Sequence, residues 1–454
     1  MNILITGLML ALCVGVITLK PTAGPGALIV CALVSAPTLI ILARPSQERT
    51  FLLRLFLLAL MIRIVLATII LGRMENFFGG DAITYDTLGQ SLLAAWHGDA
   101  YHATLYSAFV RSGAGAWGML YMVAGVYELI GSNRFAIQLI NASIGAATAI
   151  IVFYSAQTLF SNLRVSKLAA LLVAFFPSLI LWSSQALKDA LIIFALSLSI
   201  LATLRLMEKI STGYILILIV SLLALLSLRF YIFYMMCAAV AGSFIVGMKT
   251  LSAQGFLQRF VAVGAIGLAF TWFGVLQYAG AQFDQYANLR AIQTSREDQA
   301  TAGSGFGKDV DIQTTEGALT VIPMGVLYLM FAPFPWQYTT LRQSITLPEM
   351  IVWWFSFPLL VLGLWYSLKH RLRQVSPIIV FTSMLTLAYS LFQGNVGTAY
   401  RQRSQLLVFY FIFVAVGAMI LKERAEDKRR RQQLAKLELA ELQAARVLAR
   451  RRAS

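Results

Sequence analysis

An aspartate that could take part in catalysis follows two glycines in the segment Gly79-Gly80-Asp81-Ala82-Ile83-Thr84-Tyr85-Asp86. The glycines allow a bend, and the residues after them predict an amphipathic helix over 82–96. Asp81 therefore suits two compatible roles, an N-cap of that helix and a carboxylate that accepts a proton. Asp86 lies five positions further and points to another side of a helix. We interpret Asp81 as the catalytic candidate and Tyr85 and Asp86 as substrate-binding candidates.

Cationic side chains that suit an anion stand at three other predicted helix ends. They are Lys188 beside Asp189, Arg229, and the pair in the sequence Gly397-Thr398-Ala399-Tyr400-Arg401-Gln402-Arg403. Two guanidinium groups form a fork that matches a phosphate oxyanion. Structural roles stay open for Asp189 and Arg229, because an acid suits the first turn of a helix and a terminal arginine reaches lipid headgroups.

Together these residues predict a site that transfers a group from a lipid phosphate to a hydroxyl. The aspartate would help to deprotonate the attacking oxygen, while cations stabilise the departing phosphate. Asp81 and Asp189 are the catalytic candidates, and Lys188, Arg229, Tyr400, Arg401 and Arg403 are expected to bind substrate. Sugar transfer from a polyprenyl carrier is the natural candidate, although residue types and spacing do not distinguish a sugar from another group.

The elements that position these residues are membrane helices. Of 454 residues, 59% are hydrophobic and 12% are charged, and the mean hydropathy is +0.75, which excludes an ordinary soluble protein. Apolar runs of roughly 17 to 24 residues recur, and each is long enough to cross a bilayer as a helix. The fold class is thus all-α, a polytopic bundle of about twelve spans. The predicted spans are 3–19, 27–43, 51–71, 135–158, 168–184, 189–206, 213–229, 231–248, 257–275, 349–367, 376–392 and 405–421.

Charge placement predicts the orientation of the spans. Lysine and arginine collect in cytoplasmic loops, and the basic ending 422–454 is therefore placed inside. This threading keeps the apolar segments 116–130 and 318–336 as juxtamembrane or re-entrant helices on the outer face. About 24 of the 36 basic residues then lie in the inner half, with about 7 acids, against about 12 basic residues and about 13 acids outside. Both termini are expected in the cytoplasm.

The predicted organisation is a catalytic membrane domain over residues 1–421 and a basic cytoplasmic tail over 422–454. The outer loops cover about 72–134 and 276–348 of this numbering. The tail has leucines at roughly helical spacing and suits anionic lipid, a partner, or a solvated anchor of the topology. Arg63, inside a predicted span, marks a pocket or reaches the boundary by tilting.

Cofactor and nucleotide motifs are weak. The cysteines Cys13, Cys31 and Cys237 lie in apolar runs without a CxxC or Cys/His cluster, which argues against a zinc site. The segment 303–309 lacks the first glycine and the Ser/Thr of a phosphate loop. No cofactor is assigned, a divalent metal stays open, and nucleic acid is not an expected partner because most excess charge lies in the orientation-setting half.

At this point the sequence resembles the GT-C superfamily of integral membrane glycosyltransferases. The resemblance lies with the branch of protein O-mannosyltransferases and the bacterial lipid-A aminoarabinose transferase. It rests on Gly80-Asp81-Ala82-Ile83-Thr84-Tyr85, Gly131-Ser132-Asn133-Arg134-Phe135-Ala136, Phe176-Pro177 and Lys188-Asp189-Ala190-Leu191. The resemblance implies the catalytic role for Asp81. Ala82 replaces the glutamate of the family's Asp-Glu motif, which puts metal dependence and the details of acceptor activation in question.

The leading hypothesis is an inverting glycosyltransferase of a bacterial-type inner membrane. It would move a sugar from polyprenyl phosphate to a glycan, lipid or protein hydroxyl on the outer face. One alternative is a polymerase or ligase of lipid-diphosphate-linked glycans, which needs outer arginines but not Asp81 in particular. Another is a flippase or transporter of lipid-linked oligosaccharides, which is disfavoured because no internal repeat is visible. Sugar identity, acceptor, carrier length and oligomeric state are open.

Overall fold

The computed structural model describes residues 3–73, 80–111, 116–246, 289–301, 304–307, 311–337 and 341–453. In these residues the chain is almost wholly helical, with one isolated β-bridge between Gly305 and Asn395. Apolar runs in a bilayer must satisfy their backbone groups internally, and helices do so within one segment. The predicted all-α class is confirmed.

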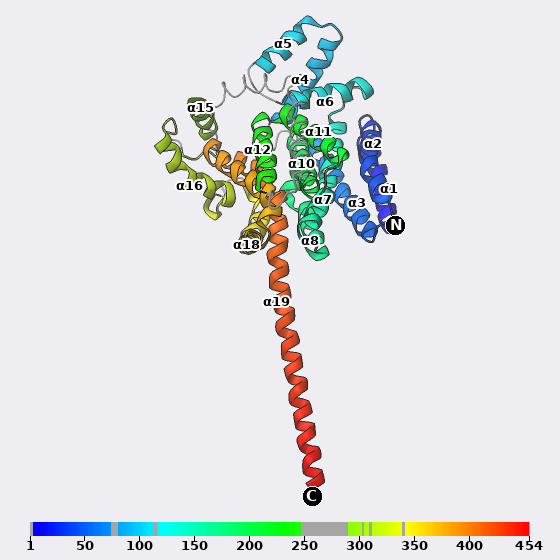
Figure 1. Cartoon of the computed structure of the whole chain (residues 1–454). Helices are drawn as coiled ribbons and strands as arrows, with labels where there is room; N and C mark the ends of the chain where they lie inside the picture. Colours follow the sequence, from blue (N-terminus) through cyan, green and yellow to red (C-terminus); the bar gives the residue numbers. More distant parts are fainter. Residues whose placement is uncertain are drawn as a thin grey trace.

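The main bundle surrounds α7 (Arg134–Phe160), whose most apolar stretch is 94% buried. Around it pack α2 (Gly24–Ala43), α3 (Arg49–Arg73), α8 (Leu163–Phe175) and α10 (Asp189–Glu208). Figure 1 shows these helices side by side, with α1 (Ile3–Leu19) at the edge. The other bundle helices are α11 (Thr212–Leu228), α12 (Phe230–Val246), α18 (Leu347–Phe392) and α19 (Val396–Ala453).

The bundle has two ends that differ in structure. We call the end where α7 begins the site end, and the end where α7 finishes the tail end. At the site end Asn133 Nδ2 donates to the Ala23 carbonyl over 2.9 Å, which joins the start of α7 to that of α2. At the tail end Arg371 Nη1 donates to Leu159 O over 3.2 Å. From the tail end the last part of α19, exposed over residues 421–441, projects away from the bundle (Figure 1).

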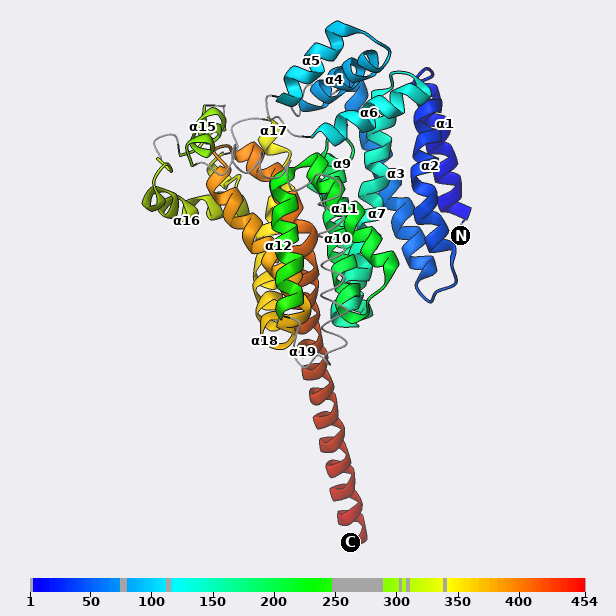
Figure 2. The same cartoon turned by 45° about the horizontal axis from the view of Figure 1, so that its top comes forward.

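Three helices cover the site end: α4 (Asp81–Trp96), α5 (Ala100–Arg111) and α6 (Trp117–Ile130). Both ends of α6 lie at this end of the bundle. A Cβ added to Gly118 would meet Ser227 of α11, and one added to Gly26 of α2 would lie 3.8 Å from Ile130. Figure 2 shows α4, α5 and α6 together at the end of the bundle opposite the projecting part of α19. The segment 116–130 thus lies over the site end of the bundle and does not run from one end to the other, as the sequence predicts.

The second predicted non-crossing segment forms α16 (Thr315–Phe331), beside α15 (Leu289–Ala300) and the short helices η1 (Pro335–Gln337) and α17 (Leu341–Ser344). Its contacts with α18 lie near the site end. Trp353 Nε1 donates to Met330 O over 2.7 Å, and a Cβ on Gly325 would stand 2.0 Å from the Ser390 carbonyl oxygen. Residues near both ends of α18 therefore hold α16.

The number of spans is less definite than the sequence suggested. Within the described ranges, six helices are long and apolar enough to cross a membrane, or seven when α8 and α9 (Pro177–Ser183) are taken as one bent span. Two predicted spans, 349–367 and 376–392, lie within α18, whose backbone breaks at Arg371. Five shorter apolar helices, including α11 and α12, complete the set. The predicted span 257–275 lies outside the described residues, so the total of about twelve stays a prediction.

The predicted span 168–184 is broken, and Arg63 supports the break. Pro177 begins α9, which is bent 54° from α8. Proline lacks an N–H, so carbonyl groups before it lose their helical partner. The Arg63 side chain, 1% exposed, donates to Ala174 O over 2.8 Å, to Ala59 O over 2.9 Å and to Ser183 Oγ over 2.8 Å. The buried cation thus joins α3 to both sides of the break.

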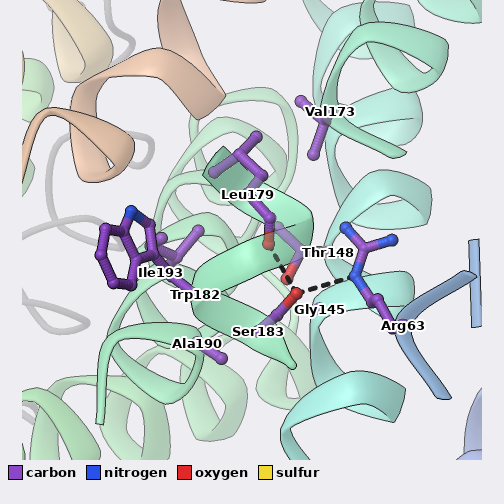
Figure 3. Close-up of a pocket in the computed structure, with 9 residues that line it drawn as sticks. All are labelled: Arg63, Gly145, Thr148, Val173, Leu179, Trp182, Ser183, Ala190 and Ile193. Carbon is purple, nitrogen blue, oxygen red and sulfur yellow. Dashed lines mark hydrogen bonds between the residues drawn. The ribbon is translucent and has the colours of Figure 1, made fainter. Parts of the chain in front are cut away.

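A small cavity lies beside this contact (Figure 3). Its volume is about 20 Å³, which is enough for little more than one water molecule. The lining residues are Arg63, Gly145, Thr148, Val173, Leu179, Trp182, Ser183, Ala190 and Ile193. Arg63 therefore marks a packed joint with a small cavity and does not reach the boundary.

The contact between α18 and α19 depends on two glycines. A Cβ added to Gly363 would lie 1.9 Å from Phe413 O, and one added to Gly417 would lie 2.1 Å from Leu359 O. Without side chains at these positions, the two backbones come close and gain van der Waals contact, which drives helix association in lipid. This packing holds the first residues of α19, which carry part of the candidate site.

We expect Gly417→Ala to destabilise the protein because its methyl group collides with a backbone carbonyl that has no room to move. Overpacking of this kind costs about 1–3 kcal/mol. The control is Gly242→Ala in α12, where no atom lies within 4 Å of the added Cβ. Thermal unfolding in detergent should show a lower midpoint for Gly417→Ala alone. Equal midpoints for the two variants would contradict the close approach.

Candidate active site at the site end of the bundle

Asp81 is the first residue of α4 and lies in its first turn, while Gly80 is the N-cap. The backbone carbonyl of Gly80 accepts from Ile83 N and Thr84 N, both over 3.0 Å. The Asp81 carboxylate accepts from Arg401, and its side chain is 55% exposed. Asp81 is thus not the N-cap, and its carboxylate faces another element of the site.

Arg401 joins the two candidate aspartates. Its Nη1 donates to Asp81 Oδ2 over 2.5 Å, while Nη2 and Nε donate to Asp189 Oδ2 over 2.6 and 2.8 Å. Asp81 and Asp189 are the first residues of α4 and α10, and Arg401 is the sixth residue of α19. Charged hydrogen bonds are shorter and stronger than neutral ones. Residues 320 positions apart in the sequence, Asp81 and Arg401, are therefore direct neighbours.

Asp189 forms the buried side of this contact. Its side chain is 0% exposed, and its Oδ1 atom has no hydrogen-bond partner among the described residues. The preceding segment is held by Asn141 of α7, whose Nδ2 donates to Gln185 O and Leu187 O over 2.6 and 2.7 Å. A side chain of the central helix thus positions the start of α10.

Aromatic side chains surround the cations. The Arg401 guanidinium lies 5.8 Å from the Trp182 ring centroid, and the Trp182 ring meets the Tyr400 ring edge-on at 6.2 Å. Lys188 Nζ lies 5.9 Å from the centroid of Tyr85, which is 7% exposed. Such contacts stabilise a cation whose hydration is reduced. The α9 segment that carries Trp182 is the one that Arg63 anchors through Ser183.

Lys188 is a buried amine among other charges. Burial and the positive charge of Arg229 together lower the pKa of Lys188 to about 7, although Asp189 acts in the opposite direction. Arg229 is the C-cap residue of α11 and donates from Nη1 to Tyr389 Oη over 3.3 Å. Lys188 and Arg229 thus belong to the electrostatic environment of Arg401 and Asp189, as the sequence grouping expected.

Asp86 lies in a separate group. Its Oδ1 atom accepts from Tyr127 Oη over 2.5 Å and from Gln90 Nε2 over 3.2 Å, and its Oδ2 lies 4.0 Å from Arg134 Nη1. Burial and the Asp86 carboxylate raise the pKa of Tyr127, so this phenol remains a donor at neutral pH. Asp86 therefore joins α4 to α6 and α7, and the separation from Asp81 agrees with the helical spacing.

The predicted arginine fork is not formed. Arg403 is 0% exposed, and its Nη1 donates to Met330 O and Ala332 O, both over 3.0 Å. Residues two apart on a helix face different sides, so Arg401 reaches the aspartates while Arg403 points toward α16. Tyr400 also faces the interior, where its hydroxyl donates to Glu349 Oε2 over 2.8 Å. In this arrangement Arg403 and Tyr400 position the start of α19.

Sequence reasoning missed several positioning residues. Glu349 was not singled out, although it is 2% exposed and accepts from Tyr400. Asn141, inside α7, was not singled out either, although it donates to two backbone carbonyls before α10. A polar residue in the middle of an apolar helix is the signal that could have found it, because such residues need an internal partner.

The described residues contain no group of three or more His, Cys, Asp or Glu side chains that could hold a metal ion. Asp81 and Asp189 are the two carboxylates of the candidate site, and both pair with the Arg401 guanidinium, which lies between them. A divalent cation prefers several oxygen ligands, whereas here a fixed positive charge takes the place between the oxygens. The residues do not fit a metal in this arrangement.

Comparisons with known proteins found one family model and a similar solved structure. Residues 116–277, less than half of the chain, match the model of the family described as Dolichyl-phosphate-mannose-protein mannosyltransferase. The apo oligosaccharyltransferase of Archaeoglobus fulgidus is a similar solved structure, with a TM-score of 0.47 and 14% identity over 85% of this chain and 52% of that chain. The chain thus spans about half the length of that protein. No curated protein matched it in sequence.

The family match supports the resemblance that the sequence motifs carry. The matched region includes α6, α7 and α10, and therefore Asn133, Asn141 and Asp189. Over residues 116–277 the chain is therefore similar to this mannosyltransferase family, and six helices of the described residues are long and apolar enough to cross a membrane.

A pH-dependent stability should follow from the burial of Lys188. The folded pKa of Lys188, about 7, lies below the ordinary value of 10.5 for a lysine side chain, so the native state binds this proton less tightly than the unfolded state. Below pH 7 the full cost of the buried charge is present, and stability rises as the pH increases from 7 toward 10.5.

Thermal unfolding of the wild type and of Lys188→Met between pH 6 and 9.5 measures this effect. The variant should gain most at low pH, and the gain should shrink by up to about 1 kcal/mol per pH unit above neutrality. A gain that does not change with pH would show that Lys188 keeps its ordinary pKa.

Proposed function

We propose that the chain transfers a sugar from a polyprenyl-phosphate donor to an acceptor hydroxyl at the site end of the bundle. The product would be a cell-envelope glycan, glycolipid or glycoprotein. The observation that carries the proposal is the direct contact of Asp81 with Arg401. An exposed carboxylate and a cation that suits phosphate thereby lie within one site, next to Lys188 and Arg229.

The chemistry requires a base at one side of the sugar and positive charge at the other. The acceptor oxygen forms a bond to the anomeric carbon, and the bond from that carbon to the phosphate oxygen breaks. The bond electrons remain on the polyprenyl phosphate, whose charge Arg401, Lys188 and Arg229 stabilise. The hydroxyl proton passes to Asp81, which acts as the general base. Direct displacement of this kind inverts the anomeric centre.

Two helix N-termini support the binding of an anion here. Asp81 and Asp189 each lie in the first turn of a helix, α4 and α10, where unpaired amide groups create a positive potential. Trp182 and the buried aromatic residues around it lower the local polarity, so charge interactions at this place are stronger than in water. The polyprenyl chain would stay in the bilayer beside the bundle.

The basic residues support an orientation with the site end on the outer face. The inner loops of the predicted topology include Arg164, Arg205 and Arg371, and the structure puts Arg371 and Arg164 at the tail end, where Arg164 contacts Glu426 of α19. Positive loops remain on the cytoplasmic side during insertion. We therefore infer an outward site, cytoplasmic termini and a bacterial-type inner membrane.

Asp81→Asn tests the proposed base. The amide retains the shape of the side chain but does not accept the hydroxyl proton, so kcat should fall by about 10²- to 10⁴-fold. Purified protein, a polyprenyl-phosphate sugar and a mixture of acceptors extracted from a deletion strain provide the assay, without an ion gradient. Glu128→Gln, which alters an exposed carboxylate of α6 that pairs with His97, is the control and should retain most activity.

The alternatives give different results. Full transfer by Asp81→Asn would favour the polymerase or ligase, which does not require this carboxylate. A donor that moves across liposome membranes without release of polyprenyl phosphate would instead indicate a flippase.

A further inference from the structure

The two ion pairs of Arg401 are unequal. The pair with Asp189 uses two nitrogen atoms, and the Asp189 side chain is fully buried. The pair with Asp81 uses one nitrogen, Nη1, and 55% of the Asp81 side chain is exposed. Exposed ion pairs contribute little to stability, whereas loss of one partner from a buried pair leaves a charge that is costly to isolate. The contact with Asp81 is therefore the weaker of the two.

A phosphate that approaches from the exposed side meets the same N–H donors. The Arg401 side chain is 18% exposed to solvent, and its Nη1 atom donates to the exposed carboxylate of Asp81. A phosphate monoester carries more negative charge than one carboxylate and has three terminal oxygens to accept hydrogen bonds. The phosphate charge is also attracted to Lys188 and Arg229, which interact electrostatically with each other and, in the case of Lys188, with Arg401 and Asp81. Phosphate and Asp81 thus compete for one guanidinium.

We propose that the donor phosphate displaces Asp81 from Arg401 while Asp189 retains the arginine, so that donor binding itself frees the carboxylate. This inference rests on the proposed function and assigns different roles to the two aspartates. Asp189 is a positioning residue that holds Arg401 from the buried side of the site. Asp81 is a competitor in the free protein and becomes the base once phosphate is bound.

The exchange has a chemical advantage. In the free protein Asp81 Oδ2 is occupied by a guanidinium hydrogen bond, so it is poorly placed to accept a proton from a hydroxyl. After displacement the same oxygen is available to the acceptor, beside the phosphate that leaves. The acceptor hydroxyl is therefore deprotonated only where a donor is already bound.

Binding measurements separate the competition from other effects. Full-length protein in nanodiscs of zwitterionic lipid is titrated with a polyprenyl phosphate and with the matching polyprenol, and bound ligand is counted by native mass spectrometry. Asp81→Asn removes the competing charge, so it should bind polyprenyl phosphate about two- to fivefold more tightly than the wild type although its kcat for sugar transfer is strongly reduced. Tighter binding by a variant with a strongly reduced kcat is the expected signature.

The matched control is Asp86→Asn. It removes one negative charge from the same helix, but its carboxylate contacts Tyr127 and lies near Arg134 instead of Arg401. A general increase in positive potential would raise phosphate affinity in both variants equally, whereas competition raises it in Asp81→Asn alone. Equal affinities of Asp81→Asn and Asp86→Asn would overturn the exchange and leave the proposed donor class in place.

Asp189 is tested by its effect on Arg401. Asp189→Asn should weaken polyprenyl-phosphate binding by more than about tenfold, because the guanidinium loses its buried anchor and turns to Asp81. Asp189→Glu should restore part of the affinity, which a purely structural loss of folding would not show. Unchanged phosphate binding in Asp189→Asn would contradict the positioning role.

Two further arms identify the source of the phosphate. Phosphatidylglycerol and inorganic phosphate are added as competitors, and neither should displace polyprenyl phosphate at equal concentration. Equal competition by phosphatidylglycerol would overturn the carrier assignment in favour of a bulk lipid headgroup. If the wild type and Asp81→Asn both bind polyprenyl phosphate no more tightly than polyprenol, the exchange and the proposed donor are overturned together.

Discussion

The ion-pair contact of Arg401 with Asp81 and Asp189 is the constraint on which the site depends. It ties α19, near the end of the sequence, to α4 and α10, and it connects an exposed carboxylate to a buried one. A buried carboxylate is tolerated only when it is paired, so Asp189 requires Arg401. The helices that carry these residues must therefore meet at one end of the bundle.

The remaining packing around the site supports this meeting point. Asn141 holds the segment before α10, and Arg63 holds the bent joint before Trp182. Arg403 and Tyr400 join the start of α19 to α16 and α18. Each uses a polar side chain inside the membrane domain to satisfy a backbone carbonyl or a buried acid. Such groups are costly in an apolar environment unless they are satisfied, which makes the positions of their partners well defined.

The arrangement also explains how one protein can combine binding and base chemistry with few charges. An arginine shared between a buried and an exposed acid keeps a fixed anchor and a variable partner. In the proposed reaction the variable partner is first Asp81 and then the donor phosphate. In that proposed scheme no additional residue is needed to time the release of the base.

The sequence by itself determined the membrane class, the helical fold and most helix positions, because the length and charge pattern of apolar runs reflect the bilayer directly. It also singled out Asp81, Asp189 and Arg401, since charged residues at helix ends stand out against an apolar background. Only the tertiary structure decided that Arg401 bridges the aspartates while Arg403 and Tyr400 turn inward. Spacing along one helix defines relative direction but not which neighbour lies there, and that depends on the packing of distant helices.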